Sequence, residues 1–348
     1  MQTATRILII CPSWLGDIIM SQSLYKVLKQ LYPGCIIDAF APAWTIPVLK
    51  RMEEVDNTIE NPFGHGVFDL LRRKAVGRSL KGNYDMAFIL PNSFKSALIP
   101  YYADINYRRG LKGESRYVVI NEMRKNKEDF PLMVQRYVSL AYSNEEVKTA
   151  SDLMDFEYPS LKAYPPSEEL IVRLNLKTDR KFIAIGCGAN YGPSKLWPFE
   201  YYAAVCEHFI KKGYAIMALG SQKDKDSVEQ VLSHIGSEYK PYFYDVAGKT
   251  DLTEALDILT LCAGAVVNDS GLMHSLAALD IPQVCIFGST STGYTPPLSK
   301  KAICVESDEP CHPCFKRECK FKTYACQKNI KHSTVIEKLE SLLEHENT

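Results

Sequence analysis

Apolar residues along this 348-residue chain fall either in short unbroken runs or in runs with helical spacing. Residues 6–11 and 36–40 are unbroken runs of the kind that form buried strands of a parallel sheet. The segment between them, residues 17–31, has an apolar face with the spacing of a helix. That face holds Ile18, Leu24, Val27, Leu28 and Leu31. The pattern predicts a strand–helix–strand unit at the start of the chain.

The same alternation continues along the rest of the chain. We expect further strands at residues 86–90, 182–187, 215–219, 265–268 and 284–287. We expect further helices at residues 69–80, 131–142, 199–212, 251–262, 275–279 and 334–344. Strands separated by helical patterns predict parallel sheets with helices on both faces.

A polar segment with several prolines, residues 158–180, interrupts this alternation and has the composition of a linker. The segments before and after it repeat the same order of strand, glycine-bearing loop, helix and strand. We therefore expect two Rossmann-like, doubly wound α/β domains that face each other across a cleft, at residues 1–165 and 166–330. Residues 331–348 would form a C-terminal helix that packs back on the first domain. Ligands of such sheets bind at the carboxyl ends of the strands.

Composition excludes some classes of protein. A hydrophobic content of 46% with 24% charged residues is typical of a soluble globular protein. Lys and Arg together number 41, as do Asp and Glu, so no net field favours nucleic acid. We expect no signal peptide and no membrane-spanning segment. We therefore expect a cytoplasmic location and reduced thiols, with Cys11, Cys187 and Cys285 buried on strands.

Residues 265–274 contain the most informative candidate site. An apolar strand runs into Asn268-Asp269-Ser270-Gly271, and a helix follows that includes His274. A helix N-terminus presents free N–H groups and a partial positive charge, which suits a phosphate. The alternative is that Asp269 and Ser270 only cap the helix.

Two other loops at strand ends carry candidate chemistry. The loop at residues 12–17 lacks the pattern G-x-G-x-x-G, which argues against a nicotinamide enzyme, and it ends in Asp17. Asp17 is either a residue of the first helical turn or a general base in the cleft. The glycine-rich loop at residues 186–198 carries Lys195 but lacks the Gly-Lys-Ser/Thr of a Walker loop. A third loop contains Asp224 and Asp226, which we interpret as the start of a helix rather than a metal site.

These motifs, in this order, resemble the heptosyltransferases of glycosyltransferase family 9, and more closely the members that add the second heptose of the lipopolysaccharide inner core. The segments that carry the resemblance are Pro12-Ser13-Trp14-Leu15-Gly16-Asp17, Met20-Ser21-Gln22-Ser23-Leu24, Ala41-Pro42-Ala43-Trp44, Gly64-His65-Gly66, Leu90-Pro91-Asn92-Ser93-Phe94-Lys95-Ser96-Ala97-Leu98, Lys195-x-Trp197-Pro198 and Asn268-Asp269-Ser270-Gly271-Leu272-Met273-His274.

The resemblance implies the glycosyltransferase B fold and metal-independent, inverting transfer of heptose from ADP-heptose to the heptose on Kdo₂–lipid A. Asp17 matches the general base, and Lys195 matches the residue that offsets charge on the departing ADP. The residues expected to bind ADP-heptose are Ser13, Gly16, Lys195, Ser221, Gln222, Asp269, Ser270, Gly271 and His274. No cofactor is required on this hypothesis.

The implied acceptor is an anionic lipid, and residues 72–116 hold ten Lys or Arg against three acidic residues. Candidate acceptor-binding residues are Arg72, Arg73, Lys74, Lys95, Arg109 and Arg116. The alternative is that these side chains are solvated on helix surfaces. The same charge predicts peripheral association with the inner leaflet of the cytoplasmic membrane.

Four cysteines near the C-terminus form a further candidate site. Cys311, Cys314, Cys319 and Cys326 have an irregular version of a zinc-binding spacing. Structural zinc, free thiols and a local disulfide all stay open, with zinc the less favoured. Two other functions also stay open, namely a non-catalytic nucleotide-binding or membrane-surface module of the same fold and a nucleotide-sugar epimerase.

Overall fold

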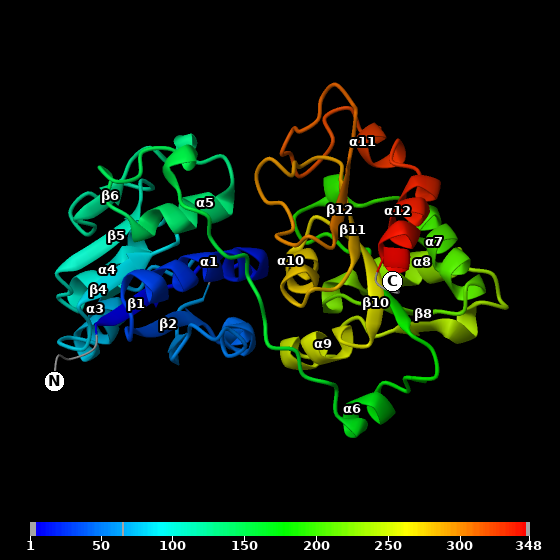
Figure 1. Cartoon of the computed structure of the whole chain (residues 1–348), viewed down its shortest axis with the longest axis horizontal. Coiled ribbons are helices and arrows are strands. Elements are labelled where there is room, and N and C mark those ends of the chain that lie inside the picture. The colour runs from blue at the N-terminus through cyan, green and yellow to red at the C-terminus, as the bar shows by residue number, and fades with distance from the viewer. Residues whose placement is uncertain (1–4, 65, 346–348) are drawn as a thin grey trace. The chain divides into compact units, whose positions relative to one another are not determined.

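The computed structural model describes residues 5–64 and 66–345, so His65 of the Gly64–Gly66 motif lies outside the described residues. The chain divides into two compact units, unit 1 (Met1–Leu161) and unit 2 (Lys162–Thr348). Each unit contains one six-stranded sheet in which every paired strand is parallel (Figure 1). The α/β class with two doubly wound units is therefore confirmed. The cleft between them stays a prediction.

Unit 1 has the strand order β3-β2-β1-β4-β5-β6. Its strands are β1 (Arg6–Ile10), β2 (Ile36–Pro42), β3 (Asn57–Asn61), β4 (Met86–Ile89), β5 (Tyr107–Leu111) and β6 (Glu122–Arg124). Its helices are α1 (Leu15–Leu31), α2 (Ile46–Leu49), α3 (Leu70–Ser79), α4 (Phe94–Tyr102) and α5 (Met133–Val138). Helix α1 packs against α5, and α3 packs against α4.

Unit 2 has the strand order β12-β11-β10-β7-β8-β9. Its strands are β7 (Phe182–Gly186), β8 (Ala215–Ala218), β9 (Phe243–Asp245), β10 (Cys262–Asn268), β11 (Gln283–Phe287) and β12 (Ala302–Glu306). Its helices are α6 (Glu168–Arg173), α7 (Phe199–Lys211), α8 (Lys225–Ser233), α9 (Leu252–Leu259), α10 (Gly271–Ala278), α11 (Ala325–Lys328) and α12 (His332–His345). Helix α6 lies within the predicted linker.

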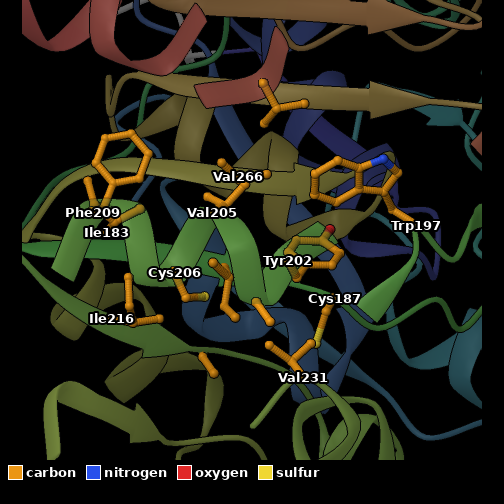
Figure 2. Packing of buried hydrophobic residues seen from close by; sticks show 14 of the residues in the cluster. Ile183, Cys187, Trp197, Tyr202, Val205, Cys206, Phe209, Ile216, Val231 and Val266 are labelled. Atoms are coloured by element: carbon orange, nitrogen blue, oxygen red, sulfur yellow. The ribbon is translucent and has the colours of Figure 1, made fainter. Parts of the chain in front are cut away.

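The core of unit 2 shows why the apolar runs become central strands. Figure 2 shows Tyr202, Val205 and Phe209 of α7 among the strand residues Ile183 and Val266. All five side chains are buried. Strands β7 and β10 lie in the middle of the sheet, so both of their faces must be apolar.

The C-terminal helix corrects one expectation. We predicted that it packs back on the first domain, but α12 is part of unit 2. Its residues Val335, Leu339 and Leu343 are buried in the core of that unit. Its Glu340 also contacts the end of α7. The Oε1 atom of Glu340 lies 2.8 Å from Nε2 of His208 and 2.9 Å from Nζ of Lys212. Cys11, Cys187 and Cys285 are buried as expected.

No helix within residues 5–64 and 66–345 is long and apolar enough to cross a membrane.

Candidate functional site

The site in unit 1 lies where the strand order reverses. Strands β1 and β4 are neighbours in the sheet, but the chain leaves them in opposite directions. The loops that follow two such strands diverge and leave a crevice at their carboxyl ends. Ser13, Gly16 and Asp17 follow β1, and the segment Leu90–Phe94 follows β4. The structure therefore brings two of the sequence motifs to one edge of the sheet.

Asp17 lies in the first turn of α1, whose N-cap is Trp14. Its Oδ1 atom accepts a hydrogen bond of 3.3 Å from the hydroxyl of Tyr137 in α5. Burial raises the pKa of Asp17 to about 6, and the Tyr137 bond lowers it by a smaller amount. A carboxylate with this pKa is ionised at neutral pH yet basic enough to accept a proton. Nothing in the sequence pointed to Tyr137, which is 120 residues away.

Three of the predicted acceptor-binding residues are buried instead. Arg73 donates from Nε to the carbonyl of Phe68 at 2.6 Å and from Nη2 to that of Val67 at 2.8 Å. Arg109 donates to the carbonyls of Leu140 and Tyr142, which follow α5, and Arg116 donates to the carbonyl of Pro91 at 2.5 Å. Their exposed fractions are 4%, 6% and 0%.

The expectation that Arg73, Arg109 and Arg116 contact an anionic acceptor is therefore wrong. Each guanidinium satisfies carbonyl groups of an irregular loop that would otherwise be buried without a partner. Arg116 holds the Pro91–Ser93 loop at the end of β4, so it supports the crevice from beneath. Arg72 is exposed, and Lys74 and Lys95 are half-buried, so for these three the acceptor role stays a prediction.

The site in unit 2 also lies at a reversal of strand order, between β7 and β10. Lys195 follows β7 and Asp269 follows β10. Nζ of Lys195 lies 2.6 Å from Oδ2 of Asp269 and 3.2 Å from its carbonyl oxygen. Nζ also lies 4.8 Å from the centre of the Tyr191 ring. Two residues that the sequence suggested separately thus form one ion pair, with exposed side-chain fractions of 13% and 7%.

The start of α10 does not fit the interpretation of Asp269 and Ser270 as helix caps alone. Ser270 occupies the N-cap position, but its side chain makes no capping hydrogen bond. Asp269 pairs with Lys195 rather than with the helix. The first N–H groups of α10, beginning at Gly271, therefore lack a side-chain acceptor beside a lysine. That arrangement suits an anion such as a phosphate.

His274 lies one turn further along α10 and is 4% exposed. Burial lowers the pKa of His274 to about 4, while Asp269 raises it and Lys195 lowers it by smaller amounts. The imidazole is therefore neutral at pH 7. It can donate or accept a hydrogen bond beside the ion pair, but it adds no charge there.

Ser194 anchors the loop that carries Lys195, and sequence reasoning missed this role. Ser194 is buried, its Oγ donates to the carbonyl of Lys316 at 2.5 Å, and its N–H donates to that of Arg317 at 3.1 Å. The amide of Gln327 donates to the Ser194 carbonyl at 2.8 Å. At Gly192, φ is 153° and an added Cβ would lie 2.6 Å from the Arg317 carbonyl, so this position requires glycine.

Asn268 joins the strand end to the same glycine-rich loop. It is fully buried, and its Oδ1 atom lies 3.0 Å from the hydroxyl of Tyr202. Its amide donates to the carbonyl of Gly188 at 3.3 Å. These bonds hold the two loops of the unit 2 crevice at a fixed spacing.

In the third loop, after β8, Ser221 and Asp224 form capping hydrogen bonds with each other. Oδ2 of Asp224 accepts from the N–H and from the hydroxyl of Ser221, both at 2.7 Å. Helix α8 begins directly afterwards, as the sequence indicated for Asp224 and Asp226. Gln222 is exposed. The roles of Ser221 and Gln222 in donor binding stay predictions.

The four C-terminal cysteines are free thiols in this structure. Within residues 5–64 and 66–345, no three His, Cys, Asp or Glu side chains are grouped as ligands of a metal ion. Burial first, and then the neighbouring thiols of Cys311, Cys314 and Cys319, raise the pKa of Cys326 to about 11. Backbone N–H groups, that of Tyr324 first, lower the pKa of Cys319.

Two doubly wound units, one with the buried carboxylate of Asp17 after a strand and the other with the Lys195–Asp269 ion pair at the start of α10, have the architecture of glycosyltransferases of the B fold. The chain belongs to glycosyltransferase family 9, the heptosyltransferase family, whose model matches residues 73–325.

Individual relatives agree with this assignment. The chain is 46% identical to lipooligosaccharide heptosyltransferase 2 of Haemophilus influenzae over 86% of its own length and 88% of the relative. It is 41% identical to lipopolysaccharide heptosyltransferase 2 of Salmonella typhimurium, with 98% and 99% covered. The structure of ADP-heptose lps heptosyltransferase II from E. coli superposes with a TM-score of 0.87 at 38% identity and covers 99% of this chain and 100% of that one.

Proposed function

We propose that this protein transfers heptose from ADP-heptose to the first heptose of the Kdo₂–lipid A inner core, with inversion at the anomeric carbon. The observation that carries the proposal is the ion pair of Lys195 and Asp269 at the open N-terminus of α10. Free N–H groups and an oriented ammonium group together suit the diphosphate of a nucleotide sugar. The family and its heptosyltransferase 2 relatives support heptose as the sugar.

The donor binds in the unit 2 crevice. Its diphosphate accepts hydrogen bonds from the N–H groups of Ser270 and Gly271 and from Lys195. Asp269 orients Lys195, and the neutral imidazole of His274 contributes a hydrogen bond. Ser221 and Gln222 contact the nucleotide from the loop after β8, and the resemblance also assigns Ser13 and Gly16 to the donor. The residues of this crevice are held by Ser194 and Asn268, so their positions are set before the donor arrives.

Transfer is a single displacement. Asp17 takes the proton from the acceptor hydroxyl as that oxygen bonds to the anomeric carbon on the face opposite ADP. The bond from the anomeric carbon to the ADP oxygen breaks at the same time, and its electron pair leaves with ADP. Lys195 and the N-terminus of α10 offset the negative charge that develops on ADP.

We also propose that this reaction needs no metal ion and no other cofactor, because Lys195 and the helix terminus supply the positive charge. Assays with and without EDTA test this point. Equal rates are expected, and a loss of transfer in EDTA that Mg²⁺ restores would contradict the proposal.

Metal analysis of protein purified without chelator tests whether Cys311, Cys314, Cys319 and Cys326 bind a structural metal. We expect no stoichiometric zinc or iron.

The enzyme acts in the cytoplasm. Its acceptor is anchored in the inner leaflet of the cytoplasmic membrane, and the enzyme associates peripherally with that membrane.

Three incubations test the whole proposal. ADP-heptose is supplied alone, with heptosyl-Kdo₂–lipid A, or with Kdo₂–lipid A that lacks heptose. ADP release and a heavier lipid product are expected only with the heptosylated acceptor. Release of ADP or a change in the sugar without acceptor would favour a hydrolase or an epimerase.

A further inference from the structure

Four large apolar side chains are exposed within one short stretch of unit 1, from the segment after β3 into the first turn of α3. Val67, Phe68, Leu70 and Leu71, here called the apolar patch, are 45%, 50%, 40% and 80% exposed. Scattered apolar residues are ordinary on protein surfaces, but four within five consecutive positions form a contiguous patch that favours a partner. The core of unit 1 does not account for them.

The apolar patch is held in place by bonds to its backbone. Arg73 donates to the carbonyls of Val67 and Phe68, and its guanidinium lies 4.0 Å from the centre of the Phe63 ring. Asp69 has a φ of 28°, in the left-handed region, and its carboxylate accepts from the N–H of Arg72 at 3.1 Å. This backbone turns the chain sharply between Phe68 and Leu70. The exposed side chains are therefore presented by a defined structure rather than by a loose loop.

The charge around the apolar patch is positive. Residues 67–81 contain five basic residues and one acidic residue, Asp69, but Arg73 is buried and Lys81 pairs with Asp104 at 3.0 Å. Asp69 is engaged in capping α3, and Arg72 and Arg78 are exposed. Apolar side chains flanked by arginines match the two layers of an anionic bilayer surface, because apolar groups enter the acyl boundary while cations meet phosphates.

The apolar patch also lies at the same edge of the unit 1 sheet as the proposed base. It follows the carboxyl end of β3, at the same edge of the sheet where Asp17 follows β1. Arg73 joins the two regions, because its Nη1 atom donates to the carbonyl of Lys95 at 3.2 Å, and Lys95 belongs to the segment that follows β4. Figure 1 shows α3 beside α4, the helix that begins in that segment.

We propose that the apolar patch docks unit 1 on an anionic lipid bilayer, with Phe68 and Leu71 in the acyl boundary and Arg72 and Arg78 at the headgroups. This inference rests on the proposed function, since a membrane-anchored acceptor is what gives the docking its purpose. The partner is the bilayer surface and not a second protein. Docking places the Asp17 edge of the sheet next to the layer from which the acceptor sugar projects.

Vesicle binding tests the inference with full-length protein. Wild type, Phe68→Ser/Leu71→Ser and the control Met154→Ser/Val172→Ser are sedimented with vesicles of phosphatidylethanolamine and phosphatidylglycerol, and with vesicles of phosphatidylcholine alone. The control residues are 65% and 77% exposed but lie outside the patch. We expect the patch variant to lose about tenfold or more in partition onto anionic vesicles, and the control to bind like wild type. Wild-type binding should weaken at high salt and on phosphatidylcholine.

Several outcomes would overturn the inference. They are an absence of wild-type binding to anionic vesicles, equal binding by the patch variant, and an equal loss in the control. A patch variant that changes the oligomeric state but not vesicle binding would assign the patch to a second copy of the chain. Transfer to a deacylated, water-soluble acceptor separates this inference from the proposed function. The patch variant should retain that transfer, whereas failure of wild type to transfer would refute the function and leave the vesicle result unaffected.

Discussion

The hydroxyl of Tyr137 is the only hydrogen-bond partner that the described residues give to the carboxylate of Asp17, and its removal makes a specific prediction. Tyr137 is 1% exposed, so Tyr137→Phe keeps the packing of α5 against α1 and deletes one donor. The bond lowers the pKa of Asp17, while burial raises it to about 6. Loss of the bond should therefore raise the pKa of the base further.

The size of the shift follows from the geometry. At 3.3 Å the bond is long, so we assign it about 1 kcal/mol, which is less than the roughly 1.5–3 kcal/mol of a well-formed bond to a charged group. About 1.4 kcal/mol corresponds to one pKa unit, which gives a rise of roughly 0.7 unit. The ionised fraction of Asp17 at pH 7 would fall from about nine-tenths to about two-thirds. At pH 9 both proteins would be fully ionised, and their rates should be close to equal.

The assay is kcat/KM for the acceptor between about pH 5 and pH 9, where the acidic limb reports the base of the free enzyme. Tyr25→Phe is a matched control, because Tyr25 is a buried tyrosine of α1 whose hydroxyl lies 2.8 Å from Ser21 and does not contact Asp17. The control should keep the wild-type acidic limb. An unshifted limb in Tyr137→Phe, or an equal loss of rate at every pH, would refute the reasoning.

Three further variants test other parts of the account. Because the folded-state pKa of Asp17 is raised, its ionisation costs stability as pH rises through about 6. Asp17→Asn should therefore unfold at higher urea near pH 8, by about 1–2 kcal/mol after allowance for partial exposure, and gain nothing near pH 4. Lys195→Met should slow the transfer step, in which ADP departs from the sugar, by roughly 10²–10³-fold. A transfer rate within about threefold of wild type would contradict the proposed role of Lys195. Arg116→Met should lower the free energy of unfolding by roughly 3 kcal/mol, because buried carbonyls lose their donor, whereas Arg78→Met at an exposed position should change it by less than about 0.5 kcal/mol.

The apolar pattern predicted the central strands well, because burial on both faces leaves few alternatives to an unbroken apolar run. It missed β5, whose residues include Arg108 and Arg109. Arg109 donates to carbonyls 31 and 33 residues away and Arg108 donates to those of Ile105 and Val119, and the apolar pattern reports neither set of bonds. Short edge strands such as β6, with the sequence Glu-Met-Arg, lack an apolar signal for the same reason.

The candidate site shows the same division. Asp17, Lys195 and Asp269 were identifiable because each lies between an apolar strand and the body of the helix that follows it, and the carboxyl ends of parallel strands share one edge. The residues that contact these side chains or hold their loops in place were not identifiable from the sequence. Tyr137 and the Ser194 anchor act through bonds that span more than a hundred residues, so only the folded chain reveals them. The prediction that Arg73, Arg109 and Arg116 bind the acceptor failed for a related reason. Charge alone does not distinguish an exposed arginine from one that binds buried carbonyls.

The most direct test of the central claim is transfer by Asp17→Asn measured beside its affinity for ADP. Asparagine has nearly the same shape as aspartate but cannot take a proton at neutral pH. In a single-turnover assay with ADP-heptose and heptosyl-Kdo₂–lipid A, we expect the variant to be slower by about 10²-fold or more, with ADP binding by calorimetry changed less than about twofold. Wild-type turnover in Asp17→Asn would contradict the assignment of the base and, with it, the mechanism.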